Sequence, residues 1–354
     1  MNLLEHQLDY PFGDRLPQVT ERIEVAPGIF WLRMPLPFAL DHINLWLLRD
    51  EIDGRSGWTL VDCGIASDPV REAWERLFVD GLDGLPLLRL LCTHSHPDHI
   101  GMADSLHRRF DAPLWISQGE YMSARVFTTM TPEMDSESQI VHYRRHGVVE
   151  KEQLDALRAR GRTYFRSLVP SVPPWFHRIS GGETVAIGSR TFRLVPGNGH
   201  SPEHIALYTE DGGQPILISG DMVLPRISTN VSVFEIEPEA NPLEWYLRSL
   251  RNYDDCATDT LVLPSHGRPF TKLHVRLGQQ HAHHAERLEV TRKASAEAAI
   301  SACELLPALF GRRFNTHELT FALGEALAHL HALWYRGELR REIDAQGVIR
   351  FGAC

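Results

Sequence analysis

Five short apolar runs in this chain each stop at an aspartate or a histidine, and this pattern narrows the folds open to it. The runs are bounded by Gly, Pro and Asp turn signals, which is typical of buried strands. Segments with helical spacing, such as 68–78, separate several of them, so we expect an α/β layered fold. The polar residues at the ends of the runs are Asp62, His94, His200, Asp221 and His266.

The chain divides into two regions of different character, and we expect two domains, 1–270 and 271–354. Strand-like runs dominate the first region, apart from a mostly helical stretch at 117–180 that we interpret as an insertion. The second region is helical and ends in two short strands around an Asp-Ala-Gln-Gly turn. Three helices followed by a hairpin are the outline of a winged-helix domain.

Composition excludes several classes of protein. The 36 Lys and Arg against 46 Asp and Glu leave a net charge of −10, which disfavours nonspecific binding to nucleic acid. The five cysteines form no CxxC pair, which argues against a disulfide framework or a thiolate zinc site. No run reaches the roughly 20 apolar residues of a membrane span, and the first residues lack a signal-peptide pattern, so we expect a cytoplasmic protein.

The segment Thr-His-Ser-His-Pro-Asp-His at 93–99 carries the strongest chemical signal. It follows a buried-strand pattern directly, so its side chains are presented at the end of that strand. His94 and His96, two residues apart on extended chain, project to the same side, whereas Asp98 and His99 can address a second position. Imidazole and carboxylate ligands suit zinc, although iron and manganese accept the same set.

This motif resembles that of the metallo-β-lactamase-fold hydrolase superfamily, and the other strand ends match it in order. Asp62 lies in Leu-Val-Asp-Cys-Gly, and His200 lies in a Gly-His-Ser-Pro segment. Asp221 follows Ile-Ser-Gly, and His266 lies in Pro-Ser-His-Gly. The resemblance covers about residues 20–270 and implies an αββα four-layer sandwich with its ligands on loops at one edge.

The resemblance also implies a site for two divalent metal ions, most simply zinc. One ion would be held by His94, His96 and His200. The other would be held by Asp98, His99 and His266, with Asp221 bridging both and Asp62 orienting the ligands. A water shared by two such ions has a pKa near 7, which supplies a bridging hydroxide for hydrolysis. Asp98 and Asp221 would be the catalytic carboxylates, with Asp98 holding or moving a proton.

Several substrates remain open within this superfamily. True β-lactamases lack an aspartate at the position of Asp221, so we favour a thioesterase similar to glyoxalase II, acting on acyl-CoA or acyl-glutathione. The alternatives are an endoribonuclease or phosphodiesterase of the winged-helix-tailed branch, a lactonase, and a non-catalytic metal-bound binding module. Residues 282–354 carry nine Lys or Arg and nine Asp or Glu, which favours a lid or a homodimer element over a nucleic-acid contact.

Further residues are candidates for contact with a small-molecule substrate. They are His42 and Asn44 on a strand, Arg226 and Asn230 beyond Asp221, and Tyr121, Tyr143 and Arg144 in the insertion. In the second region, we interpret His281, His283 and His284 as a solvated helix face, and His329 and His331 as packing residues.

Overall fold

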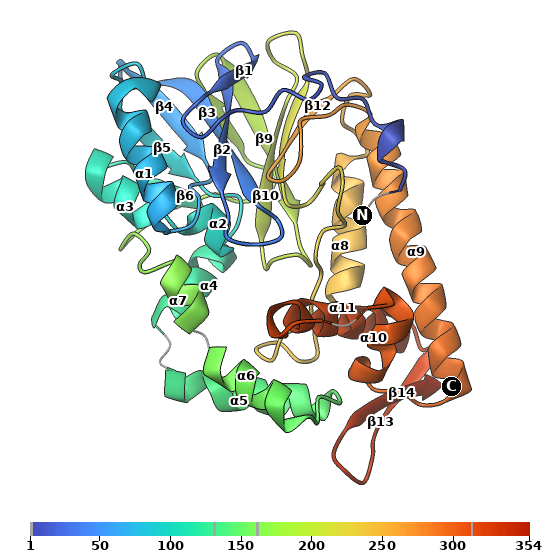
Figure 1. Ribbon diagram of the computed structural model, residues 1–354. Helices are drawn as coiled ribbons and strands as arrows, with labels where there is room; N and C mark the ends of the chain where they lie inside the picture. The colour runs from blue at the N-terminus through green and yellow to red at the C-terminus, as the bar shows by residue number, and fades with distance from the viewer. Residues whose placement is uncertain (1–2, 130–131, 161–162, 313) are drawn as a thin grey trace.

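Two β-sheets packed against each other form a sandwich in one part of the molecule, and the insertion and the C-terminal region lie below it in Figure 1. The computed structural model describes residues 3–129, 132–160, 163–312 and 314–354. The interface between the sheets is filled by large apolar side chains such as Trp31, Trp46 and Phe192, none of them exposed. This arrangement confirms the expected αββα sandwich.

The first sheet has seven strands in sequential order among the described residues. Neighbours are antiparallel up to β4, and the later pairs are parallel. Parallel strands end at the same edge, so the loops after β4 and β5 lie together. The strands are Ile23–Ala26 (β1), Ile29–Pro35 (β2), His42–Ile52 (β3), Arg55–Val61 (β4), Leu87–Leu91 (β5), Leu114–Ile116 (β6) and His177–Arg178 (β7).

The second sheet has the order β12-β11-β10-β9-β8. Strands β11 and β12 are parallel, and the other neighbours are antiparallel. As a result, the ends of β9, β11 and β12 and the start of β10 meet at one edge. The strands are Thr184–Ile187 (β8), Arg190–Gly197 (β9), His204–Thr209 (β10), Ile216–Gly220 (β11) and Leu261–Pro264 (β12).

Outside the insertion, the described part of the 1–270 region has four helices, of which α1, α3 and α8 cover the outer faces of the sandwich and α2 lies at its edge (Figure 1). The amphipathic α1 buries Val70, Ala73 and Trp74 against the first sheet, as its helical spacing predicts. Short 3₁₀ or π segments also occur at Glu5–Gln7, Leu77–Gly81 and Arg251–Tyr253. The four helices are Asp68–Arg76 (α1), Pro97–Ile100 (α2), Ala103–Phe110 (α3) and Pro242–Leu250 (α8).

The expected insertion is helical and is packed in two places. Tyr121 and Ala124 on α4 join the apolar core beneath the first sheet, whereas Ile140 on α5 and Leu157 on α6 join a core shared with the C-terminal helices. The insertion therefore reaches from the sandwich to the C-terminal region. Its helices are Gln118–Thr129 (α4), Pro132–Arg145 (α5), Lys151–Arg160 (α6) and Thr163–Leu168 (α7).

The described residues of the C-terminal region form three helices and an antiparallel hairpin, as the sequence pattern predicts. Capping boxes at Ser301 and Asn315 begin the second and third helices. Its core is continuous with the outer face of the second sheet, because Leu323 and Leu327 share one cluster with Val195 and Leu217. The elements are Leu273–Glu297 (α9), Ala302–Phe310 (α10), Thr316–Tyr335 (α11), Leu339–Ile343 (β13) and Ile349–Ala353 (β14).

No helix in the described ranges combines the length and the apolar character that crossing a membrane requires. The division of the chain into domains at residue 270 stays a prediction.

Candidate metal centre

The strand ends of both sheets bring seven candidate ligands together at one edge of the sandwich. They divide into two groups, and within each group the donor atoms lie within 4.8 Å of one another. We call the first the His94 group and the second the Asp98 group. The His94 group is His94, His96, His200 and Asp221, and the Asp98 group is Asp98, His99 and His266.

The donor atoms of the His94 group converge on one point. His94 Nε2 lies 2.9 Å from His96 Nδ1 and 3.2 Å from His200 Nε2. Asp221 Oδ2 lies 3.4 Å from His200 Nε2. The loops that carry these residues follow β5, β9 and β11, so three separate strand ends build the group.

The Asp98 group lies on the other side of Asp221. Asp98 Oδ2 is 3.7 Å from His99 Nε2 and 3.3 Å from His266 Nε2. Asp221 Oδ1 is 3.6 Å from His99 Nε2 and 3.4 Å from His266 Nε2. The two oxygens of Asp221 therefore face different groups, which is the arrangement of a carboxylate shared by two ions.

These separations fit divalent ions. Metal–ligand distances of about 2.0–2.2 Å in a tetrahedral site place the ligands about 3.3–3.6 Å apart. Apart from the 2.9 Å between His94 and His96, the donor–donor distances given above lie within about 0.1 Å of that range. His99 Nε2 and Asp221 Oδ1 are buried and have no hydrogen-bond partner within the described ranges. A buried polar atom without a partner is costly, and coordination of an ion would satisfy both.

Hydrogen bonds behind the ligands fix how the imidazoles point. Nδ1 of His99 donates to Asp62 Oδ2 at 2.8 Å, and Nδ1 of His200 donates to the Asn230 carbonyl at 2.7 Å. Nδ1 of His266 donates to the His42 carbonyl at 2.8 Å. In each case Nδ1 is the donor, which directs Nε2 toward the centre of the site, where an ion could take the place of a proton.

Two imidazoles of the His94 group are held in the neutral form, which is the form that binds a metal. Burial lowers the pKa of His94 well below its usual range, and the neighbouring His99, His96 and His200 lower it further. Burial and His200 lower the pKa of His96 to about 3.

The Asp98 group is ionised without a metal. Burial alone would lower the pKa of His99, but Asp62, Asp98 and Asp221 raise it to about 9. The pKa of His266 is likewise held well above its usual range, because Asp221 and Asp98 outweigh its burial. Burial would raise the pKa of Asp98, but His99 and His266 lower it to about 2. Cations that replace the imidazole protons would preserve this charge balance.

Asn44 is a structural residue, which corrects the expectation of substrate contact. Its side chain is fully buried, and its amide group donates to the carbonyls of Pro264 and Gly267 at 2.8 and 2.9 Å. Its oxygen accepts from the Trp31 indole at 2.8 Å, so its hydrogen-bonding groups are all engaged. Asn44 thereby ties β3 to the loop that carries His266.

His42 supports the same loop. Its Nε2 accepts from the Gly267 amide at 2.8 Å, and its Nδ1 lies 2.7 Å from Asp41 Oδ1. Both ring nitrogens are therefore engaged within the protein, which leaves none for a substrate.

Arg226 and Asn230, the two candidates for substrate contact beyond Asp221, lie in different surroundings. Arg226 Nε lies 3.2 Å from Glu5 Oε2, in a pocket of about 420 Å³ formed with the N-terminal segment. Asn230 acts through its carbonyl on His200, while its side-chain oxygen accepts from the Ser232 hydroxyl at 2.8 Å.

The aromatic residues proposed for the insertion are packing residues. Tyr121 is buried, stacks on Phe176 and donates to the Pro173 carbonyl at 2.8 Å. Tyr143 is buried in the core shared with the C-terminal helices.

The histidines of the C-terminal helices are partly as expected. His329 and His331 are buried, as packing residues should be. His284 is buried as well, with Nδ1 3.3 Å from His329 Nε2, so it does not belong to a solvated face.

Two residues of the site were not identified from the sequence. Glu120 on α4 is fully buried and accepts from the amides of Ser95 and Glu203 at 2.9 and 2.7 Å, which joins two ligand loops. His204 accepts from the Asp221 amide at 3.3 Å and packs beside His94. His204 stands four residues after His200, a spacing that was the one available signal.

Two family models match this chain. Residues 40–266 match the family described as the Metallo-beta-lactamase superfamily, and residues 288–354 match the Metallo-beta-lactamase-like, C-terminal domain. The crystal structure of a beta-lactamase domain protein from Burkholderia ambifaria is 54% identical, with a TM-score of 0.93 and full coverage of both chains. A metallo-beta-lactamase family protein from Thermus thermophilus is 27% identical, with a TM-score of 0.74 over 94% of this chain and 100% of that one.

Curated relatives are more distant. The probable metallo-hydrolase YflN of Bacillus subtilis is 26% identical over 57% of this chain and 66% of its own length. The probable metallo-hydrolase YqgX of the same organism is 26% identical over 40% of this chain, and the match spans about half (51%) of that relative.

Proposed function

Because the chain belongs to the metallo-beta-lactamase superfamily, we propose that it is a hydrolase that uses two divalent ions to cleave a thioester. The observation that carries the proposal is the position of Asp221, whose two oxygens face the His94 group and the Asp98 group. A structural metal site needs one ion with all its positions closed, whereas two groups around one carboxylate suit catalysis.

The residues present fit zinc, iron or manganese. His94, His96 and His200 would hold one ion, and Asp98, His99 and His266 the other, with Asp221 shared. Two bound ions would lower the pKa of a water between them toward 7 and polarise the carbonyl oxygen of the substrate.

The chain itself orients these groups and handles the proton. Asp62, Asn230 and His42 hold three imidazoles through their Nδ1 protons. The side chain of Asp98 is 19% exposed, compared with 11% for Asp221, so Asp98 is the more open carboxylate toward solvent. We assign to Asp98 the orientation of the attacking water and the transfer of its proton.

Apolar side chains are exposed on the segment that follows Asn230, the residue whose carbonyl holds His200, and they favour an acyl substrate over a polyanion. Phe234 and Ile236 are 43% and 57% exposed on the segment that follows Asn230. Phe321, on α11, is 42% exposed. It lies one turn before Gly324, whose carbonyl accepts a hydrogen bond from the Val233 amide. Exposed apolar groups near a site mark the binding of apolar ligands. The equal numbers of cationic and anionic residues in 282–354 offer no excess positive charge to RNA.

Initial rates of the zinc-loaded protein on a substrate panel test the proposal. The panel contains acyl-CoA and acyl-glutathione thioesters, a lactone, a nitrocefin-type β-lactam and short RNA. Asp221→Ala should abolish the activity, whereas Asp259→Ala makes the same change at an exposed position and should leave it intact.

Thioester turnover that depends on Asp221 supports the proposal. Turnover of RNA or of the lactone alone would replace the substrate class and keep the hydrolase. A protein that binds zinc but hydrolyses nothing in the panel would favour a binding module.

A further inference from the structure

A glycine in the middle of α11 lies where the C-terminal region meets the metal centre. Glycine in a helix interior destabilises the helix by about 0.5–1 kcal/mol relative to alanine, so Gly324 calls for a packing reason. A Cβ at this position would lie 2.6 Å from Cβ and Oγ of Ser232 and 3.3 Å from its Cα. No real Cβ approaches a neighbour so closely, so glycine permits this contact.

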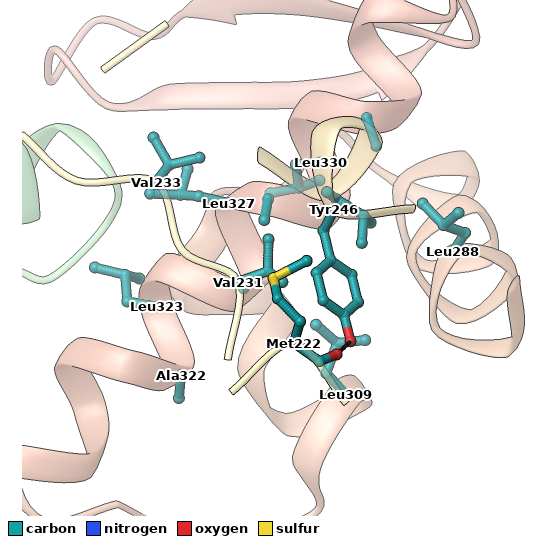
Figure 2. Close-up of a cluster of buried hydrophobic side chains, with 14 of the residues drawn as sticks. Met222, Val231, Val233, Tyr246, Leu288, Leu309, Ala322, Leu323, Leu327 and Leu330 are labelled. Atoms are coloured by element: carbon teal, nitrogen blue, oxygen red, sulfur yellow. Dashed lines mark hydrogen bonds between the residues drawn. The ribbon is translucent and has the colours of Figure 1, made fainter. Parts of the chain in front are cut away.

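The same turn of α11 is hydrogen-bonded to the segment 230–233. The Val233 amide donates to the Gly324 carbonyl at 3.2 Å. On either side of Ser232, Val231 and Val233 are buried, and Figure 2 shows them packed with Leu323 and Leu327 of α11. One face of α11 therefore holds the segment in three ways: by a backbone hydrogen bond, by the close contact between Ser232 and Gly324, and by apolar packing.

This segment holds a candidate ligand. The Asn230 carbonyl accepts from Nδ1 of His200 at 2.7 Å, and the Ser232 hydroxyl donates to the Asn230 side chain at 2.8 Å. A displacement of Ser232 would therefore move the group that keeps His200 Nε2 directed at the centre of the site.

We propose that α11 is a positioning element for the His94 group, with Gly324 as the positioning residue that sets His200 through Ser232 and Asn230. The inference rests on the proposed function, since it requires an ion at the His94 group. It gives the C-terminal region a role in metal binding rather than in contact with nucleic acid.

The Asp98 group provides an internal comparison. His99 is held by Asp62, and His266 is held by the His42 carbonyl; both of these supports come from the first sheet. A change at Gly324 should therefore affect one metal ion and spare the other, which general loosening of the fold would not do.

Zinc titration against a chromophoric chelator tests the inference. The His94 group is measured in a His266→Ala background, and the Asp98 group in a His200→Ala background. Gly324→Ala should lower the zinc affinity of the His94 group about 10–100-fold, the range for groups that orient metal ligands, and leave the Asp98 group unchanged. The d–d absorption of the cobalt-loaded His94 group should shift as well.

Two further variants control for folding. Gly278→Ala makes the same substitution in α9, where a Cβ meets nothing within 4 Å, and should leave both affinities unchanged. Ser232→Gly combined with Gly324→Ala removes Cβ and Oγ of Ser232, the two atoms nearest the new methyl group, together with the hydroxyl that donates to Asn230. The double variant should therefore return the affinity of the His94 group to that of Ser232→Gly alone.

The outcomes separate this inference from the proposed function. If the unmodified protein binds no zinc, the proposed function fails. If it binds zinc at both groups and Gly324→Ala has no effect, weakens both groups equally, or lowers the affinity further in the Ser232→Gly background, the positioning role of α11 is wrong.

Discussion

The two groups of candidate ligands share Asp221, but different parts of the molecule support them. The Asp98 group is held by residues of the sandwich, namely Asp62 and the His42 carbonyl. The His94 group also depends on the insertion, through Glu120, and on the C-terminal region, through the segment that α11 contacts. The insertion and the C-terminal region therefore support the His94 group, whereas, among the described residues, the sandwich alone supports the Asp98 group.

The largest expected effect is at the residue that joins the groups. Asp221→Ala removes a donor from both, so activity should fall by more than about 100-fold, since changes that merely reorient ligands cost 10–100-fold. Metal content by mass spectrometry and initial rates check this together. Retention of two tightly bound ions in this variant would contradict the assignment of Asp221 as a carboxylate shared by both ions.

Asp62→Asn should weaken the Asp98 group selectively. In the unmodified protein one Asp62 oxygen accepts from the Thr93 amide at 2.8 Å, and the asparagine oxygen can keep this hydrogen bond. The NH₂ group of the asparagine would instead face the Nδ1 proton of His99. We expect a 10–100-fold loss of zinc affinity at the Asp98 group in the His200→Ala background. Equal losses at both groups would contradict separate supports.

Glu120→Gln should weaken the His94 group to a smaller extent. The carboxylate joins the Ser95 and Glu203 amides, and an amide side chain keeps one of its two acceptors. Loss of a hydrogen bond to a charged group costs about 1.5–3 kcal/mol, which chemical denaturation would detect. Zinc affinity in the His266→Ala background should fall about tenfold. Glu152→Gln, at an exposed position on α6, is the matched control.

Acid should loosen the contact between the insertion and the C-terminal region. Burial, together with His331 and Arg145, lowers the pKa of His142 to about 4. Burial, together with His142 and His331, lowers the pKa of His146 to about 2. Arg341 and Glu239 face the same cluster. The neutral forms are favoured on folding, so this stability is complete above the unfolded pKa of about 6.5 and is lost as pH falls toward 4.

Urea unfolding at pH 7 and pH 5 measures this effect. Each pH unit below 6.5 should cost up to about 1.4 kcal/mol for each such histidine. His142→Gln should reduce the pH dependence, whereas His177→Gln, at an exposed position, should not. An unchanged pH dependence in His142→Gln would show that the cluster does not carry the acid sensitivity.

Local sequence patterns predicted α/β layering and the histidine-rich segment at 93–99, whereas the αββα sandwich and the full set of residues that meet at the site were implied by the resemblance to the superfamily. Apolar runs that end in Asp62, His94, Asp221 and His266 predict strands and the positions where chemistry is displayed, because strand ends in neighbouring strands lie together. The three helices and the hairpin of the C-terminal region also follow from periodicity and turn residues.

The role of individual side chains near the site could not be read in the same way. Asn44 and Asn230 looked equivalent as polar residues near the expected site, yet one is sealed by three hydrogen bonds and the other acts through its backbone. Glu120 carried no motif at all, since its partners Ser95 and Glu203 are 25 and 83 residues away.

The sequence by itself therefore determined which donor atoms this protein offers and at which strand ends, since those signals are short-range and periodic. Only the tertiary structure decided what holds each donor in place. The contact between Gly324 and Ser232 joins segments far apart in the chain, and such contacts depend on how helix faces and loops pack, which no local pattern specifies.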